Sequence, residues 1–195
     1  MTTLAELEAA STVVVAANTS LFRIQRITPR AGAAVIGPLH LPPRGLLNNR
    51  FDVATDDAAY FAATAVAAAY ETVARRDAAQ VSLSGDIALR EMLTIATTAP
   101  MQLHDLRSFA PRWPVLQSLR YGATQGLAAA LRAAGSDGFV YRSAQQPGAD
   151  CYCLIGANLL ATLHLVARAS LTNAAGNLHR VVADALRGSQ VPLAP

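Results

Sequence analysis

Acidic side chains suited to catalysis are few in this sequence, so each one can be weighed individually. The glutamates are Glu6, Glu8, Glu71 and Glu91. Glu71 falls on a helix that we expect to begin after Thr64, where its spacing predicts an ordinary surface pair with Arg75 at i+4. It also follows Tyr70 directly, beside the apolar stripe of that helix. Glu71 is therefore either a solvated helix residue or the carboxylate of a site.

Arg50 is the second candidate, because it ends a long segment rich in proline and glycine and stands next to Phe51. Its ordinary interpretation is a surface salt bridge with Asp52, Asp56 or Asp57, all of which follow closely. Ser143 ends an expected strand just before a turn, where serine is common. Composition and spacing alone leave both interpretations open.

Motifs for metal, phosphate and nucleophile chemistry are missing. The histidines are scattered without metal-ligand spacing: His40, His104, His164 and His179. The sequence has no glycine-rich phosphate loop, no G-x-S-x-G elbow and no H-E-x-x-H helix. Cys151 and Cys153 have no partner cysteines or nearby histidine to make a zinc pattern, which favours buried packing in a reducing compartment. We expect no metal site.

The elements that must position these residues alternate between short strands and helices. Residues 28–48, with many prolines and glycines, predict a loop, and long loops are often functional. Ile87–Thr97 and Leu159–Ser170 fit either a strand or a helix. The remaining predicted elements are strands Leu21–Ile27, Ala58–Ala62, Met101–Leu106, Phe139–Ser143 and Asp150–Ile155, and helices from Thr64 to Arg76, Thr124–Ala134 and Val181–Arg187.

Length and composition bound the class of protein. The chain has 195 residues, 52% of them hydrophobic and 15% charged, which predicts a single α+β domain with a sizeable core. Every basic residue is arginine, yet the net charge is only +3 and no arginine run interleaves with aromatics, so we expect no direct nucleic-acid binding. Met1–Leu21 has no basic signal-peptide region and Cys151–Ala167 is too short to span a membrane. We expect a cytoplasmic protein that does not bind membranes.

Several segments, taken in order, resemble the RES domain family, named for its Arg, Glu and Ser residues. Leu21–Arg26 is similar to the family's opening strand, and Asn49–Phe51 to its G-R-[FWY] element. Tyr60 and Glu71 follow Arg50 with the spacing of the family's R…Y…A…E run. The remaining matches are Leu103–Leu106, similar to a vLDL strand, and Ala123–Ser143, similar to aTQ…A..L…G.DGi.ypS. The resemblance covers about residues 21–156, with extensions at 1–20 and 157–195.

The resemblance implies a core like that of ADP-ribosyltransferase toxins, built of short mixed or antiparallel strands with surrounding helices. It also implies that NAD is the substrate rather than a cofactor, cleaved at the nicotinamide–ribose bond with water or inorganic phosphate as the acceptor. Family members are toxins of toxin–antitoxin systems. Their partner is an antitoxin with a helix-turn-helix domain that blocks the active-site cleft.

The family's residue roles carry over to matching positions here. Arg50, with Arg23 beside it, would grip the pyrophosphate, because a guanidinium fork makes bidentate hydrogen bonds to phosphate. Glu71 would stabilise the positive charge that develops on the ribose. Tyr60 would stack on nicotinamide, and Ser143 would hydrogen-bond ribose or phosphate. Phe51 stands at the aromatic position of the G-R-[FWY] element and is included among the substrate-binding residues.

Departures from the family pattern keep other functions open. Asn49 replaces the glycine before the arginine, and the aspartates between Asp52 and Asp57 should weaken anion binding unless they turn outward. These aspartates motivate an alternative, a degenerate module that binds a nucleotide or a protein without turnover. Protein ADP-ribosylation is a further alternative, but Ala69 stands two positions before Glu71, where transferases commonly carry an acidic residue.

Overall fold

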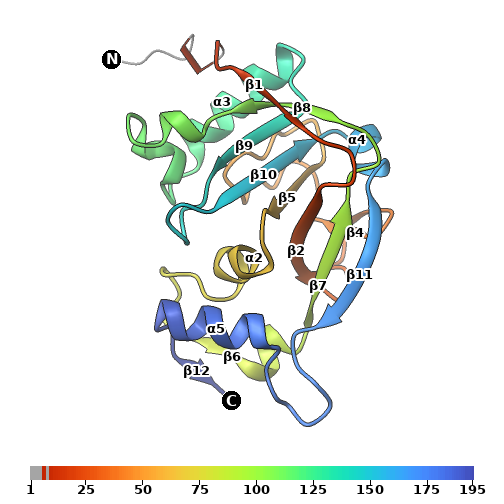
Figure 1. Ribbon diagram of the computed structural model, residues 1–195, viewed down its shortest axis with the longest axis vertical. Helices are drawn as coiled ribbons and strands as arrows, with labels where there is room; N and C mark the ends of the chain where they lie inside the picture. Colours follow the sequence, from red (N-terminus) through yellow and green to blue (C-terminus); the bar gives the residue numbers. More distant parts are fainter. Residues whose placement is uncertain (1–5, 8) are drawn as a thin grey trace.

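An eight-stranded sheet organises the computed structural model, which describes residues 6, 7 and 9–195 (Figure 1). Its strand order is β1-β8-β9-β10-β5-β2-β7-β11, and every neighbouring pair is antiparallel except the parallel pair of β8 and β9. The strands are β1 (Thr12–Val15), β2 (Ser20–Arg26), β5 (Ala58–Ala62), β7 (Arg90–Ala96), β8 (Met101–Asp105), β9 (Gly138–Arg142), β10 (Asp150–Ile155) and β11 (His164–Ser170). The α+β expectation is confirmed.

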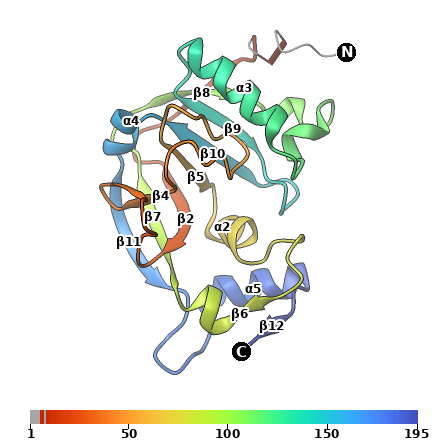
Figure 2. The same ribbon diagram turned by 180° about the vertical axis from the view of Figure 1, so that it is seen from behind.

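Two short strand pairs, four α-helices and three short helical turns of other types, at Leu83–Ile87, Arg107–Phe109 and Pro114–Gln117, accompany the sheet in the described part of the chain. The pairs are β3 (Ala34–Ile36) with β4 (Leu39–Leu41), and β6 (Val81–Ser82) with β12 (Leu193–Ala194). The helices are α2 (Ala65–Thr72), α3 (Gly122–Ala133), α4 (Ala157–Ala161) and α5 (Arg180–Ser189). Seen from behind, α2 lies across the open side of the curved sheet, with α5 beneath it (Figure 2).

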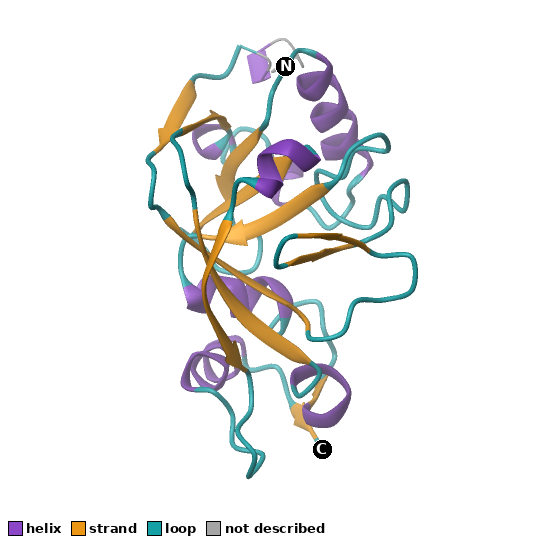
Figure 3. Cartoon of the chain, turned by 90° about the vertical axis from the view of Figure 1, so that its right-hand side faces the viewer, coloured by secondary structure: helices purple, strands orange, loops and turns teal. Residues whose placement is uncertain are grey.

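Strand alternation divides the core between the two faces of the sheet. On β10, Cys151 and Cys153 point to one face and Leu154 to the other, as period-two geometry requires. The first face is covered by α2, α3 and α5, and the second by α4 and the β3–β4 hairpin. Figure 3 shows the hairpin standing apart from the long strands on this side. Both cysteines are buried and unpaired, as the packing interpretation predicted.

The sheet narrows at one junction. β2 pairs with β7 along its whole length, from Ser20 opposite Ala96 to Arg26 opposite Arg90. Its register with β5 on the other side is limited to Phe22 opposite Ala62. The strands therefore form two blocks, β1-β8-β9-β10-β5 and β2-β7-β11, that meet at this seam.

Most predicted elements are confirmed, and three expectations need correction. The 28–48 loop contains the β3–β4 hairpin, and Leu159–Ser170 is part helix and part strand, since α4 ends before β11 begins. The helix after Thr64 ends at Thr72, not Arg76, because the Val73 and Ala74 N–H groups both donate to the Ala69 carbonyl and close the last turn. Of the expected N-terminal extension, residues 1–5 and 8 lie outside the described residues. Among the described helices, none has the length and apolarity to cross a membrane.

Candidate active site

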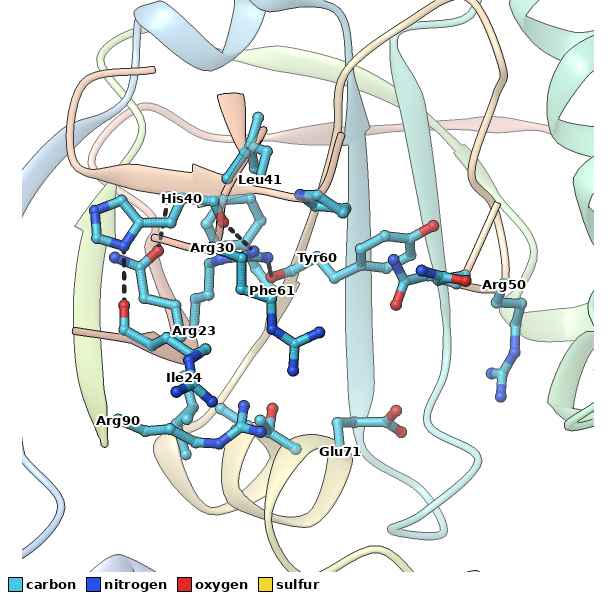
Figure 4. A pocket seen from close by; sticks show the side chains of 18 of the residues that line it. Arg23, Ile24, Arg30, His40, Leu41, Arg50, Tyr60, Phe61, Glu71 and Arg90 are labelled. Carbon is cyan, nitrogen blue, oxygen red and sulfur yellow. Dashed lines mark hydrogen bonds between the residues drawn. The ribbon is translucent and has the colours of Figure 1, made fainter. Parts of the chain in front are cut away.

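A cavity of ≈ 540 Å³ opens between α2, the 28–50 segment and the strands β2 and β5. Arg23, Arg50, Tyr60 and Glu71 all line it, so the structure brings together four of the six residues singled out from the sequence. Figure 4 shows Glu71 rising from α2, with Arg50 to one side and Arg30 and Arg90 to the other.

The turn that follows β9 fixes the carboxylate of Glu71. The Ser143 hydroxyl donates to Glu71 Oε1, and so do the backbone N–H groups of Ala144 (3.1 Å) and Gln145 (3.3 Å). Among the described residues, no hydrogen bond reaches Oε2. Glu71 therefore presents one oxygen to the cavity while the other is held in place by three donors.

Arg75 does not form an ion pair with the Glu71 carboxylate, because helix α2 ends before it reaches Arg75. Arg75 pairs instead with Asp77, through Nε at 3.0 Å and Nη2 at 2.8 Å. The predicted i+4 pair between Glu71 and Arg75 is therefore wrong. The physical reason is the early end of the helix at Thr72, which takes Arg75 off the helical register.

Arg50 is buried, with 7% of its surface exposed, and it takes part in none of the ion pairs among the described residues. Its Nε and Nη1 atoms are shielded from solvent and make no hydrogen bond. The guanidinium lies 6.0 Å from the ring centroid of Tyr121 and 5.8 Å from that of Tyr141, distances at which ring electrons attract a cation. Unsatisfied buried donors are costly, so this geometry fits an anionic ligand that accepts from them.

A closed turn holds Arg50 in this position. Asp52 Oδ2 accepts the backbone N–H of Asn49 at 2.7 Å, and Oδ1 accepts the Tyr60 hydroxyl at 2.8 Å. The Phe51 N–H donates to the same hydroxyl at 2.9 Å. Asn49 and Asp52 thus supply with side chains the turn for which the family pattern uses glycine.

The aspartates after Arg50 turn away from the cavity, and none of them lines it. Asp56 pairs with Arg132 at 3.1 Å, and Asp57 accepts from Arg44 Nε at 3.0 Å. Burial acts to raise the pKa of Asp56, but hydrogen bonds from the Thr55 hydroxyl and Arg132 outweigh it and lower this pKa below its usual value. The proposed salt bridge of Arg50 with any of these three aspartates is absent, which removes the expected weakening of anion binding.

Arg23 connects neighbouring strands through its guanidinium, a role that the sequence did not predict. Its Nη1 donates to the Tyr60 carbonyl and its Nη2 to the His40 carbonyl, each at 3.0 Å. Burial lowers the pKa of Arg23 to about 10. Only Nε is left without a partner, so Arg23 is a brace between β2, β4 and β5 more than a free anion ligand.

Two predicted binding residues lie outside the cavity lining. Phe51 is fully buried and packs against Phe139 and Tyr141, with ring centroids 5.2 Å and 4.8 Å away. Ser143 is 1% exposed, and its hydroxyl is used by Glu71 and by the N–H groups of its own turn. In this structure both residues stand behind the cavity wall, because Phe51 packs in the core and the Ser143 hydroxyl is bonded to Glu71.

Tyr60 contributes its ring to the cavity, while its hydroxyl belongs to the Asn49–Asp52 turn. Burial raises its pKa well above the usual value, as it does for Tyr141. Both phenols therefore stay neutral at ordinary pH. Burial likewise raises the pKa of the Cys151 thiol, which favours the protonated form of this cavity-lining group.

The sequence reading missed three arginines on the cavity wall: Arg26, Arg30 and Arg90. A signal existed in part, because Arg26 closes the alternating strand and Arg30 opens the proline-rich segment. Their convergence depends on the register of β2 with β7, which no local pattern contains. The described residues include no group of histidine, cysteine or acidic side chains arranged to hold a metal ion.

These features describe an α+β protein with one cavity that is lined by both a buried arginine without an ion-pair partner among the described residues and a carboxylate held by three hydrogen-bond donors. The family to which it belongs follows from a sequence comparison, in which the RES domain model matches residues 20–172. The chain belongs to the RES domain family. The matched range includes α4 and β11, which lie beyond the motifs that carry the resemblance.

A solved structure shares the fold. A chain in the crystal structure of the M. tuberculosis MbcT–MbcA toxin–antitoxin complex superposes with a TM-score of 0.58 and 14% sequence identity. The similarity covers 89% of this chain and 93% of the other. No curated protein matches the chain.

Proposed function

We propose that the chain is a toxin enzyme that cleaves NAD at the nicotinamide–ribose bond. The observation that carries this proposal is that one cavity contains both the free Oε2 atom of Glu71 and the guanidinium of Arg50, whose Nε and Nη1 atoms make no hydrogen bond. Membership of the RES domain family supports it, since the family's known members degrade NAD.

The chemistry assigns one task to each side chain. Arg50 binds a phosphate oxygen of the pyrophosphate through donors that have no other acceptor. As the bond to nicotinamide breaks, positive charge grows on the ribose, and the fixed carboxylate of Glu71 stabilises it more in the transition state than in the ground state. Nicotinamide leaves with the electrons of the bond, and water or phosphate adds to the ribose carbon.

The alternatives lose their motivation in this geometry. A binding module without turnover was suggested by the aspartates near Arg50, and all of them are paired away from the cavity. Transfer of ADP-ribose to proteins remains disfavoured, because Ala69 is fully buried in α2 and offers no acidic side chain.

We expect a protein antitoxin with a helix-turn-helix domain as the partner, in the cytoplasm. The complex from which the similar solved chain comes is itself a toxin–antitoxin pair, which supports this proposal. The antitoxin would act by covering the opening of the cavity, so growth arrest on induction of the toxin should be relieved when both proteins are produced together.

The test is nicotinamide release from NAD by the purified protein, with and without phosphate. We expect Glu71→Gln to lower the rate by about 100-fold or more, because glutamine keeps an oxygen for the three donors but loses the charge. Asp184→Asn, which removes an exposed carboxylate on α5, is the matched control and should cleave like the wild type.

Separation of the second product decides the acceptor, because water yields ADP-ribose and phosphate yields its 1″-phosphate. Intact NAD in the presence of wild-type protein would overturn the proposal. So would a Glu71→Gln variant as fast as the wild type. Binding of ADP-ribose without turnover would then favour the module without catalysis.

A further inference from the structure

Three arginines gather at one end of the cavity, away from Arg50. Arg26 ends β2 and Arg90 begins β7, and the two stand directly opposite each other in the strand register. Arg30 lies shortly after β2, and its side chain points into the same space as that of Arg90 (Figure 4). Like charges opposite each other on neighbouring strands destabilise a sheet. Burial lowers the pKa of Arg90, and the charges of Arg26 and Arg30 add to this shift while the charge of Asp86 opposes it.

The charge of Asp86 compensates this cluster, defined as Arg26, Arg30 and Arg90, only in part, by acting on Arg90. Within the described part of the chain, none of the three forms an ion pair. Arg90 Nε donates to the backbone carbonyl of Asp86 at 3.1 Å, while the Asp86 carboxylate accepts the Ser82 N–H at 3.1 Å. The cluster therefore has an electrostatic cost that an anionic ligand would offset.

The net positive charge of the cavity lining is larger than the net negative charge of NAD. Arg50 and the three cluster arginines have no carboxylate partner, and Glu71 is the acidic residue among the lining residues, so an excess of three positive charges remains. In this count Arg75 is paired with Asp77, and the charge of Arg23, which its carbonyl acceptors do not neutralise, is offset by the charge of Asp86 acting on Arg90. NAD carries two negative phosphates and one positive nicotinamide ring. A phosphate monoester on the ligand would add about −1.5 to −2 charges.

We propose that the cluster binds a phosphate monoester on the sugar of the ligand, so that the cavity prefers a 2′-phosphorylated dinucleotide, NADP, to NAD. Pro29 and Ala31, the neighbours of Arg30, line the wall beside the cluster and offer an apolar surface for a base. This inference rests on the proposed function and names its substrate class. Free inorganic phosphate shares the same chemistry, and the experiment separates the two sources.

Calorimetric titration of the full chain with ADP-ribose and with 2′-phospho-ADP-ribose tests the preference without requiring turnover. We expect the phosphorylated ligand to bind about tenfold more tightly or better, which corresponds to about 1.4 kcal/mol. Arg30→Gln should remove most of that ratio, and because Arg30 is exposed this variant should fold normally. Arg180→Gln, on α5 with a side chain 91% exposed, makes the same change of charge elsewhere and should retain the ratio.

The outcomes separate this inference from the proposed function. Equal affinity for the two ligands in the wild type, with NAD still cleaved, would overturn the preference alone. An Arg30→Gln variant that weakens both ligands by the same factor would also overturn it, because the cluster would then contact the shared pyrophosphate. Saturable binding of inorganic phosphate that Arg30→Gln abolishes, without any preference between the two ligands, would assign the cluster to free phosphate and overturn the ester. Failure of both ligands to bind would overturn the proposed function as well.

Discussion

At the scale of single residues, the site depends on how a buried cation is kept without a carboxylate. Arg50 stays unpaired because Asp52, the nearest acid in the chain, gives both oxygens to Asn49 and Tyr60. The acid that could neutralise the arginine is thus used to shape its turn. Tyr60 is a positioning residue in this arrangement as well as part of the wall.

Tyr60→Phe should raise KM for the dinucleotide by about tenfold and lower kcat much less. The change removes the hydroxyl that joins Asp52 to the Phe51 N–H, so the turn carrying Arg50 loosens while Glu71 keeps its donors. Loss of the hydroxyl should also cost about 1–2 kcal/mol in the free energy of unfolding. Steady-state kinetics and urea unfolding measure the two effects.

Tyr70→Phe is the control, because no hydrogen bond of the Tyr70 hydroxyl occurs among the described residues, and it should change neither quantity. A Tyr60→Phe variant that loses stability but keeps its KM would show that the hydroxyl has no positioning role.

Residue types and order predicted Arg50 and Glu71, because each is unusual in its local context and the family spacing joins them. They could not predict that Arg23 would be committed to two carbonyls, or that Ser143 would serve Glu71 instead of substrate. Those facts depend on atoms brought together from distant segments. The arginine cluster was missed for the same reason, since strand register places its members opposite each other.

At the scale of elements, local patterns located five strands of the large sheet within a residue, namely β2, β5, β8, β9 and β10, because apolar and polar residues alternate along several of them. Thr64 was also predictable as a cap, and its Oγ1 accepts the Ala67 N–H at 3.1 Å. The β3–β4 hairpin was not, since three-residue strands carry too little alternation for a pattern.

Gly138, the first residue of β9, should not tolerate a side chain. Its φ is 150°, and a Cβ built there would lie 2.1 Å from the carbonyl oxygen of Cys153 on β10. We expect Gly138→Ala to lower the free energy of unfolding by about 3 kcal/mol, measured by chemical denaturation. Gly126→Ala, inside α3 with no atom within 4 Å of the new Cβ, should instead raise it by up to about 1 kcal/mol. Equal effects of the two changes would contradict the close approach of β9 and β10.

At the scale of the whole molecule, acid should destabilise the protein before its carboxylates titrate. Burial lowers the pKa of His104 below the usual 6.5, and its Nδ1 lies 2.9 Å from the Ser136 hydroxyl. Below pH 6.5 the unfolded chain therefore binds a proton that the folded chain resists, so the free energy of unfolding falls as pH falls.

Unfolding measured between pH 8 and pH 5 should show this loss, and His104→Gln should flatten the curve over that interval. Asp105→Asn on the same strand removes a carboxylate whose pKa is lowered from 3.8 by Arg107, so it should lower the free energy of unfolding by the same amount throughout this interval, and the loss should fade only near and below pH 4. An unchanged slope in His104→Gln would assign the loss to other groups.

The seam between β2 and β5 is a place where the two blocks of strands could move relative to each other. Apart from one register pair and the brace of Arg23, the two blocks of strands are joined by little hydrogen bonding across this line. The cavity lies over it, with Arg26 and Arg90 on one block and Tyr60 on the other. A dinucleotide bound at both ends of the cavity would contact both blocks of strands. Ligand binding would therefore stabilise the folded protein and reduce motion between the blocks. An inhibitor bound over the opening would contact the same two blocks. The inhibited toxin would then be the form with the highest free energy of unfolding.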